Sequence, residues 1–171
     1  TLNDPQHRAY QALRPGATVA LPWGRGVGLS WFTRFAWYTL VAEHDYRPRK
    51  EAPPPWPRGV RIVHLLTDAK DFRADAFDRI DRELCYGWGA LGGRLSRGNM
   101  CITFAGGSRV DFVSEVRMRD PELHRWRADM ITCDDADRLN VKRYDALVTP
   151  LFSHPWGVRI ELLGGIPHNA P

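Results

Sequence analysis

Short runs of apolar and β-branched residues recur along the chain and predict the strands of a sheet. Each run is bounded by glycine, proline or charged residues, as is typical of buried strands. The predicted strands are 18–21, 60–66, 100–104, 110–113, 130–133 and 158–163. Helical patterns separate several of them, and strands that alternate with helices favour a largely parallel sheet covered by helices.

Four segments have the spacing of apolar residues that is typical of helices. They are 5–13, 30–43, 69–86 and 137–152. The third has the clearest pattern, because its apolar residues are four apart along one face and an aspartate precedes it in the N-cap position. The residues concerned are Asp68, Phe72, Ala76, Ile80 and Leu84.

Two segments depart from the alternation of strands and helices. Between residues 100 and 114, Gly106 and Gly107 join two apolar runs without room for a helix, which predicts an antiparallel hairpin added to the sheet. Residues 46–59 are rich in proline, which excludes a helix and predicts an exposed loop within the domain. The prolines are Pro48, Pro53, Pro54, Pro55 and Pro57.

The composition is that of one soluble globular domain spanning residues 1–171, with 43% hydrophobic and 26% charged residues. No run approaches the roughly 20 apolar residues needed to cross a bilayer, and no secretory signal begins the chain, so we expect a cytoplasmic protein without a membrane partner. The net charge of +4 permits an anionic partner. The widely spaced Cys85, Cys101 and Cys133 predict core thiols rather than a zinc site.

A glycine-rich turn follows the first predicted strand and precedes an apolar helix. This order places backbone N–H groups and the positive end of a helix where phosphates bind. A Walker A loop requires a lysine before its Ser or Thr, and here Leu29 occupies that position. Arg25 is a candidate substitute for the missing charge. The predicted nucleotide-binding residues are Gly24, Arg25, Gly26, Val27, Gly28, Leu29 and Ser30.

Two alternatives to a phosphate loop remain at this turn. One is a strand-to-helix turn that binds nothing. The other is a dinucleotide-binding turn, which is disfavoured because the third glycine of that fingerprint is missing at the required spacing.

A second candidate site lies about 100 residues further on, where the predicted strand 130–133 ends in Asp134 and Asp135. In phosphoryl transfer, one carboxylate holds the water shell of Mg²⁺ and a second orients or deprotonates the attacking water. Alone, two such residues are as readily a capped turn before a helix. Together with the glycine loop they favour a site in which Ser30 and Asp134 hold Mg²⁺ and Asp135 orients water.

The order and spacing of these segments resemble the ATPase domain of a phage terminase large subunit, the motor that packages DNA into procapsids. The resemblance covers nearly the whole chain and rests on residues 19–30, 102–112, 129–137 and 162–167. It implies an α/β, P-loop NTPase-like three-layer fold with a mostly parallel central sheet and an antiparallel hairpin addition. It also implies ATP and Mg²⁺ as cofactors and hydrolysis of the β–γ phosphoanhydride.

The chain departs from that family at three chemical positions. Leu29 replaces the loop lysine, Asp135 replaces a catalytic glutamate, and Ile166 replaces the hydroxyl residue of a coupling motif. A carboxylate that falls about 1 Å short can cost about 10²-fold in rate, and a neutral Leu29 removes charge stabilisation of the phosphoryl group. We therefore expect weakened activity. The alternative is a non-catalytic ATPase-fold module used for assembly.

The resemblance also implies further residues and partners. Arg125 lies where the family has arginines near the nucleotide, and Gln6 or Gln11 is a candidate for the adenine edge, with a surface glutamine as the plainer interpretation. The implied partners are double-stranded DNA, the portal or the small terminase subunit, and further copies of the chain in a ring. Family members have an additional nuclease domain, which we do not expect within these residues.

Two weaker hypotheses concern histidines and tryptophans. A different α/β enzyme would use His64 or His154, but neither has a nucleophile or metal-ligand partner beside it in the sequence, so a structural role is favoured. The tryptophans suggest base stacking, although aromatic residues within strands and helices more often belong to the core. They are Trp23, Trp31, Trp37, Trp88 and Trp156.

Overall fold

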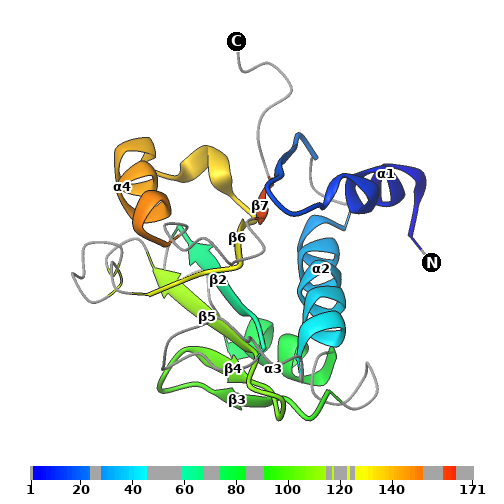
Figure 1. Ribbon diagram of the computed structural model, residues 1–171, viewed down its shortest axis with the longest axis vertical. Coiled ribbons are helices and arrows are strands. Elements are labelled where there is room, and N and C mark those ends of the chain that lie inside the picture. Colours follow the sequence, from blue (N-terminus) through cyan, green and yellow to red (C-terminus); the bar gives the residue numbers. More distant parts are fainter. Residues whose placement is uncertain are drawn as a thin grey trace.

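The computed structural model shows helices and strands alternating along most of the chain (Figure 1). It describes residues 2–23, 28–45, 59–67, 74–83, 91–114, 117, 123, 126–151 and 160–164. The helices are α1 (Asp4–Ala12), α2 (Leu29–His44), α3 (Ala74–Asp81) and α4 (Val141–Leu151). The strands are β1 (Thr18–Leu21), β2 (Arg61–Leu66), β3 (Arg94–Ser96), β4 (Cys101–Thr103), β5 (Arg109–Ser114), β6 (Met130–Cys133) and β7 (Ile160–Gly164).

The strands form one sheet in the order β1-β7-β6-β2-β5-β4-β3. The first five of these are parallel to their neighbours, whereas β4 and β3 are added antiparallel beyond β5. This arrangement confirms the predicted mostly parallel sheet and the hairpin between residues 100 and 114. The last strand in the sequence, β7, lies between β1 and β6, so the first strand and the strand that precedes the aspartates are two places apart.

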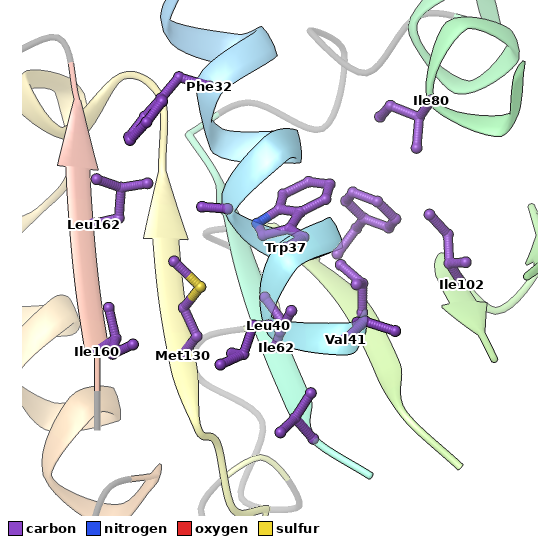
Figure 2. Close-up of a cluster of buried hydrophobic side chains, with 14 of the residues drawn as sticks. Phe32, Trp37, Leu40, Val41, Ile62, Ile80, Ile102, Met130, Ile160 and Leu162 are labelled. Carbon is purple, nitrogen blue, oxygen red and sulfur yellow. The ribbon is translucent and has the colours of Figure 1, made fainter. Parts of the chain in front are cut away.

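Helices cover both faces of the sheet, with α1 and α2 on one side and α4 on the other (Figure 1). Apolar side chains from α2, α3 and the strands gather on the α2 side, where Trp37 lies among the strands' side chains (Figure 2). On the other face, Leu147 and Val148 of α4 pack with Val63 and Ile131. The buried core therefore has two layers separated by the sheet, as expected for a three-layer α/β fold.

Local chemistry sets where the helices begin. Asn3 and Gln6 form a reciprocal capping box at the start of α1, with Asn3 Oδ1 accepting from Gln6 N at 3.0 Å and Gln6 Oε1 accepting from Asn3 N at 3.1 Å. Helix α4 begins later than the predicted residue 137. The Asn140 side chain accepts a hydrogen bond from Arg143 N, and residues Ala136–Arg138 form a separate 3₁₀ turn.

Most predicted elements are confirmed with boundaries shifted by a few residues. The sequence missed β3, a short strand with an exposed arginine that is defined by its pairing with β4. Within the predicted helix 69–86 the structure describes α3, and Ile80 is buried as expected. Asp68, Phe72, Leu84 and residues 46–58 of the proline-rich loop lie outside the described residues. None of the described helices has the length and apolar character needed to cross a membrane.

Candidate functional site

The candidate site lies at the carboxyl edge of the parallel strands. Leu21 of β1 is paired with Gly164 of β7, and Cys133 of β6 is paired with Leu163, so these three strands end side by side. Helix α2 connects β1 to β2 on one face of the sheet, while α4 connects β6 to β7 on the other. Ligands of open α/β sheets bind outside the carboxyl ends of strands where connections diverge in this way.

The N-terminus of α2 faces this edge without a side-chain cap. Its N-cap residue, Gly28, has a left-handed backbone with φ of 79°, a conformation that favours glycine. A methyl group at Gly28 would also meet Gln6 Nε2 at 3.0 Å. The uncapped N–H groups of the first turn suit an anion. Gly24, Arg25, Gly26 and Val27 lie outside the described residues, so their predicted role is unchanged.

The structure corrects the plainer interpretation of Gln6 as a surface residue. Gln6 is only 6% exposed, because it caps α1 and places its amide against Gly28. Gln11, in contrast, is exposed and pairs with His7 of the same helix. The first helix thus contacts the start of α2 through Gln6, whose predicted role at the adenine edge stays a prediction.

The Leu29 side chain packs against the end of β7. A methyl group added at Gly164 would overlap both terminal carbons of Leu29, so the glycine leaves the space that this leucine occupies. Leu29 is half-buried and belongs to the apolar cluster on the α2 face. Ser30, the next residue, is exposed on the first turn of the helix.

A hydrogen bond joins the helix that follows the glycine loop to the first of the two aspartates. Thr33 Oγ1 donates to Asp134 Oδ1 at 2.6 Å, although the two residues are 101 positions apart. The structure therefore places the helix that follows the glycine loop beside the first of the two aspartates. The partner hydroxyl belongs to Thr33, one turn beyond Ser30, and Ser30 itself shares no hydrogen bond with Asp134 among the described residues.

The second aspartate, Asp135, is exposed and precedes the 3₁₀ turn, with its backbone oxygen accepting from Arg138 N at 3.0 Å. Its side chain does not cap this turn. The predicted role of Asp135 in orienting water stays a prediction, as does that of Arg125, which lies outside the described residues.

A buried polar group lies beneath the candidate site. Thr132 Oγ1 is 2.8 Å from His64 Nδ1 and accepts a hydrogen bond from Trp37 Nε1 at 3.1 Å. Burial lowers the pKa of His64. The charge of Arg34 lowers it further, whereas the charge of Asp134 raises it. The imidazole is therefore neutral at pH 7. These contacts explain His64 as a core residue that supports the site. His154 lies outside the described residues.

The donor set at this edge suits Mg²⁺ better than a soft metal. No three His, Cys, Asp or Glu side chains gather as a ready metal site in the described part of the chain. Mg²⁺ commonly binds through one or two carboxylates together with waters and substrate phosphates, so a single acid such as Asp134 fits. Cys101 and Cys133 are buried free thiols, as predicted, while Cys85 lies outside the described residues.

Comparison with known proteins finds likeness in structure rather than in sequence. No protein-family model matches the chain, and no curated protein matches it. The ATPase domain of the Thermus phage P74-26 large terminase superposes with a TM-score of 0.66 at 17% identity, covering 100% of this chain and 67% of that one. The HK97 bacteriophage large terminase gives 0.65 at 11% identity, covering 96% and 33%.

A third neighbour is the Sulfolobus solfataricus SWI2/SNF2 ATPase core, solved in complex with dsDNA, with a TM-score of 0.58 at 17% identity over 98% of this chain and 32% of that one. The chain thus spans two thirds of the first neighbour and about a third of the other two. At these identities the likeness establishes the fold. The chain has the α/β ATPase fold found in phage large terminases, as the sequence resemblance predicted.

Proposed function

We propose that the chain is an ATPase motor domain of the terminase type that binds Mg²⁺-ATP at the carboxyl edge of β1, β7 and β6, with weakened turnover. The observation that supports this most directly is the Thr33–Asp134 hydrogen bond, because it places the strand-end acid beside the helix that follows the glycine loop. Phosphates and a metal-binding carboxylate must be neighbours for phosphoryl transfer.

Each part of the site has a defined task in this proposal. The backbone from Gly24 to Leu29 and the uncapped end of α2 bind the phosphates. Ser30 and Asp134 hold Mg²⁺, which when bound neutralises phosphate charge. Asp135, which is exposed at the end of β6, orients the attacking water.

Two features explain why we expect slow hydrolysis. Leu29 is neutral and packs against Gly164, so the parent chain has no ammonium at this position to stabilise the phosphates. Asp135 is one methylene shorter than the glutamate expected there, and a misplacement of about 1 Å can cost about 10²-fold in rate.

The partners implied by the resemblance are part of the same proposal. The fold is shared with an ATPase core that was solved with dsDNA, and the chain has a net charge of +4, which suits an anionic polymer. We accordingly propose double-stranded DNA as the substrate that is moved. The portal, a small terminase subunit and further copies of the chain in a ring are the proposed assembly partners, in the cytoplasm of a host cell.

One observation favours the rival function, a non-catalytic module that keeps the fold for assembly. Leu29 fills the space beside Gly164 and packs against the hydrophobic core. The position where a Walker A loop has its lysine therefore contributes to packing in this chain. In a protein selected only for assembly, leucine at this position stabilises the fold, and the loss of ATP hydrolysis has no cost.

Calorimetric titration with ATP, in Mg²⁺ and in EDTA, tests the proposal on the parent chain and on Leu29→Lys. The lysine restores a charge at the phosphates, and we expect at least a tenfold tighter Kd for Mg²⁺-ATP together with measurable phosphate release. Val141→Lys is the matched control, because Val141 is 69% exposed at the start of α4 and the substitution adds the same charge on the opposite face of the sheet from α2.

The two functions give different outcomes. If Leu29→Lys binds and hydrolyses ATP and Val141→Lys does not differ from the parent, the chain is a motor domain with a disabled phosphate loop. If neither the parent nor Leu29→Lys binds ATP although both are folded, the proposal is wrong and the assembly module is the better description.

A further inference from the structure

Thr33 differs from the other threonine of α2 in what its hydroxyl does. Within helices, threonine hydroxyls commonly bond to the carbonyl of the preceding turn, as Thr39 Oγ1 does with Phe35 O at 2.9 Å. The Thr33 hydroxyl instead crosses to the sheet and donates to Asp134 Oδ1 at 2.6 Å. Bonds from a hydroxyl to a carboxylate in this range are charge-assisted and strong. Thr33 is 1% exposed, so the donor is also shielded from water.

A second contact below the first keeps α2 in register with β6. Trp37 is one turn beyond Thr33 on the same face of α2, and it donates to Thr132, which is two residues before Asp134. Four helical residues rise about 6 Å and two strand residues about 6.7 Å, so the two polar contacts repeat at nearly the same interval. Figure 2 shows Trp37 between α2 and the strands. The helix therefore holds the threonine donor at one fixed place beside the carboxylate.

This contact leaves one face of Asp134 available. Its Oδ1 accepts from Thr33, while Oδ2 accepts no hydrogen bond from the part of the chain that the structure describes. A carboxylate has capacity for about four hydrogen bonds or metal contacts, and the described residues use only one of these at Asp134. Residues that fix the direction of a metal ligand in this way typically change metal affinity 10- to 100-fold when they are removed.

Resting on the proposed function, we infer that Thr33 is a positioning residue that orients Asp134 for Mg²⁺ bound with ATP. Ser30 remains the hydroxyl proposed to contact the metal, and Thr33 acts through the carboxylate. This assigns a task to a residue whose setting in an apolar helix otherwise indicates only packing.

The test measures how much Mg²⁺ tightens ATP binding, taken as the ratio of the Kd in EDTA to the Kd in Mg²⁺, in the Leu29→Lys background. Thr33→Val keeps the shape and the β-branch but removes the donor, and we expect this ratio to fall about tenfold or more while the Kd in EDTA changes less than about twofold. Thr33→Ser restores the hydroxyl and should keep the ratio within about threefold of the Leu29→Lys value.

Thr39→Val is the matched control, because it removes a hydroxyl from the same helix that bonds only within the helix. It should leave the ratio unchanged. If Thr33→Val does not fold, Thr33→Cys replaces it, since a thiol has similar size and donates weakly. A ratio in Thr33→Val or Thr33→Cys equal to that of Thr39→Val overturns the inference and leaves the proposed function intact. No Mg²⁺-dependent binding in the Leu29→Lys background overturns both.

Discussion

The carboxylates at the two edges of the sheet have different hydrogen-bond partners. At the amino edge, β2 and β5 begin. There Asp111 Oδ2 accepts a hydrogen bond from Arg61 Nε and Asp111 Oδ1 accepts one from Arg109 Nε, each at 2.7 Å. Nearby, Asp129 Oδ2 accepts the Arg61 backbone N–H at 2.7 Å. At the carboxyl edge, Asp134 receives only the Thr33 hydroxyl from the described residues.

Among the described residues, the difference separates Asp111, which has charged partners on both oxygens, from Asp134, which has one neutral donor and which we propose as a metal ligand. Asp111 has both oxygens paired with guanidinium groups, and Arg61 also lies 3.7 Å above the Trp126 ring. Guanidinium groups on both oxygens balance the charge of Asp111, so this carboxylate is poorly suited to a metal cation. A carboxylate with one neutral donor keeps its charge and most of its lone pairs, as a metal site requires.

The largest loss of stability is expected when Asp111 is substituted. Arg61 and Asp111 have side chains only 6% and 3% exposed, so Asp111→Asn leaves a buried guanidinium without its counter-charge. Burial already lowers the pKa of Arg61 although Asp111 opposes this. We expect a loss of about 3–5 kcal/mol in the free energy of unfolding, measured by urea denaturation.

Asp78→Asn provides the control for Asp111→Asn. It breaks the Arg97–Asp78 ion pair, whose side chains are both more than half exposed. Pairs in water contribute little, so the expected change is within about 0.5 kcal/mol. Equal losses from the two substitutions would show that the amino edge is not held by its buried charges.

The pKa values of the two buried thiols depend on the charges around them at each edge. Substituting these cysteines is expected to change the pH dependence of stability by an intermediate amount. Burial raises the pKa of Cys133, which precedes Asp134, from 9.0 to about 12, and the neighbouring aspartates add to the rise while a backbone N–H of Asp135 opposes it. Burial also raises the pKa of Cys101, but the charges of Arg109 and Arg61 oppose that rise.

A raised thiol pKa in the folded state contributes stability that is complete below pH 9 and is lost as the pH rises toward 12. Cys133→Ala should therefore flatten the fall of unfolding free energy over this window by up to about 1.4 kcal/mol per pH unit. The measurement is urea denaturation between pH 8 and about pH 11. Cys101→Ala should flatten it less, and parallel curves for the parent and Cys133→Ala would contradict the prediction.

The fold could be predicted from sequence because its elements are set by local pattern. The parallel strands are mostly apolar runs and α2 is an apolar helix, so the order and type of these elements followed from the sequence. The short β3 could not be predicted in this way, because it depends on pairing with β4 rather than on its own residues. The start of α4 shifted because Asn140 provides a cap beyond the 3₁₀ turn.

The candidate site was predicted in part. The sequence singled out Leu29, Ser30 and Asp134, which lie near one edge of the sheet and whose roles stay predictions, but it overlooked Thr33. A threonine inside an apolar helix suggests only a packing role. The one sequence signal for Thr33 was that it follows Ser30 by three positions, on the same side of the helix. The burial of Gln6 was also missed, since it depends on how α1 packs against Gly28. Such tertiary contacts leave no periodic pattern in a sequence.

The smallest expected effect on stability, and the sharpest on binding, comes from Asp134→Asn. The asparagine oxygen still accepts the Thr33 hydrogen bond, and no buried cation loses a partner, so the free energy of unfolding should change by less than about 0.5 kcal/mol. Calorimetry should show that Mg²⁺ no longer tightens ATP binding, whereas Asp145→Asn, which removes an exposed charge from α4, leaves it unchanged. A stability loss as large as that of Asp111→Asn would place Asp134 among the structural carboxylates, because only a charge that balances buried cations costs that much to remove.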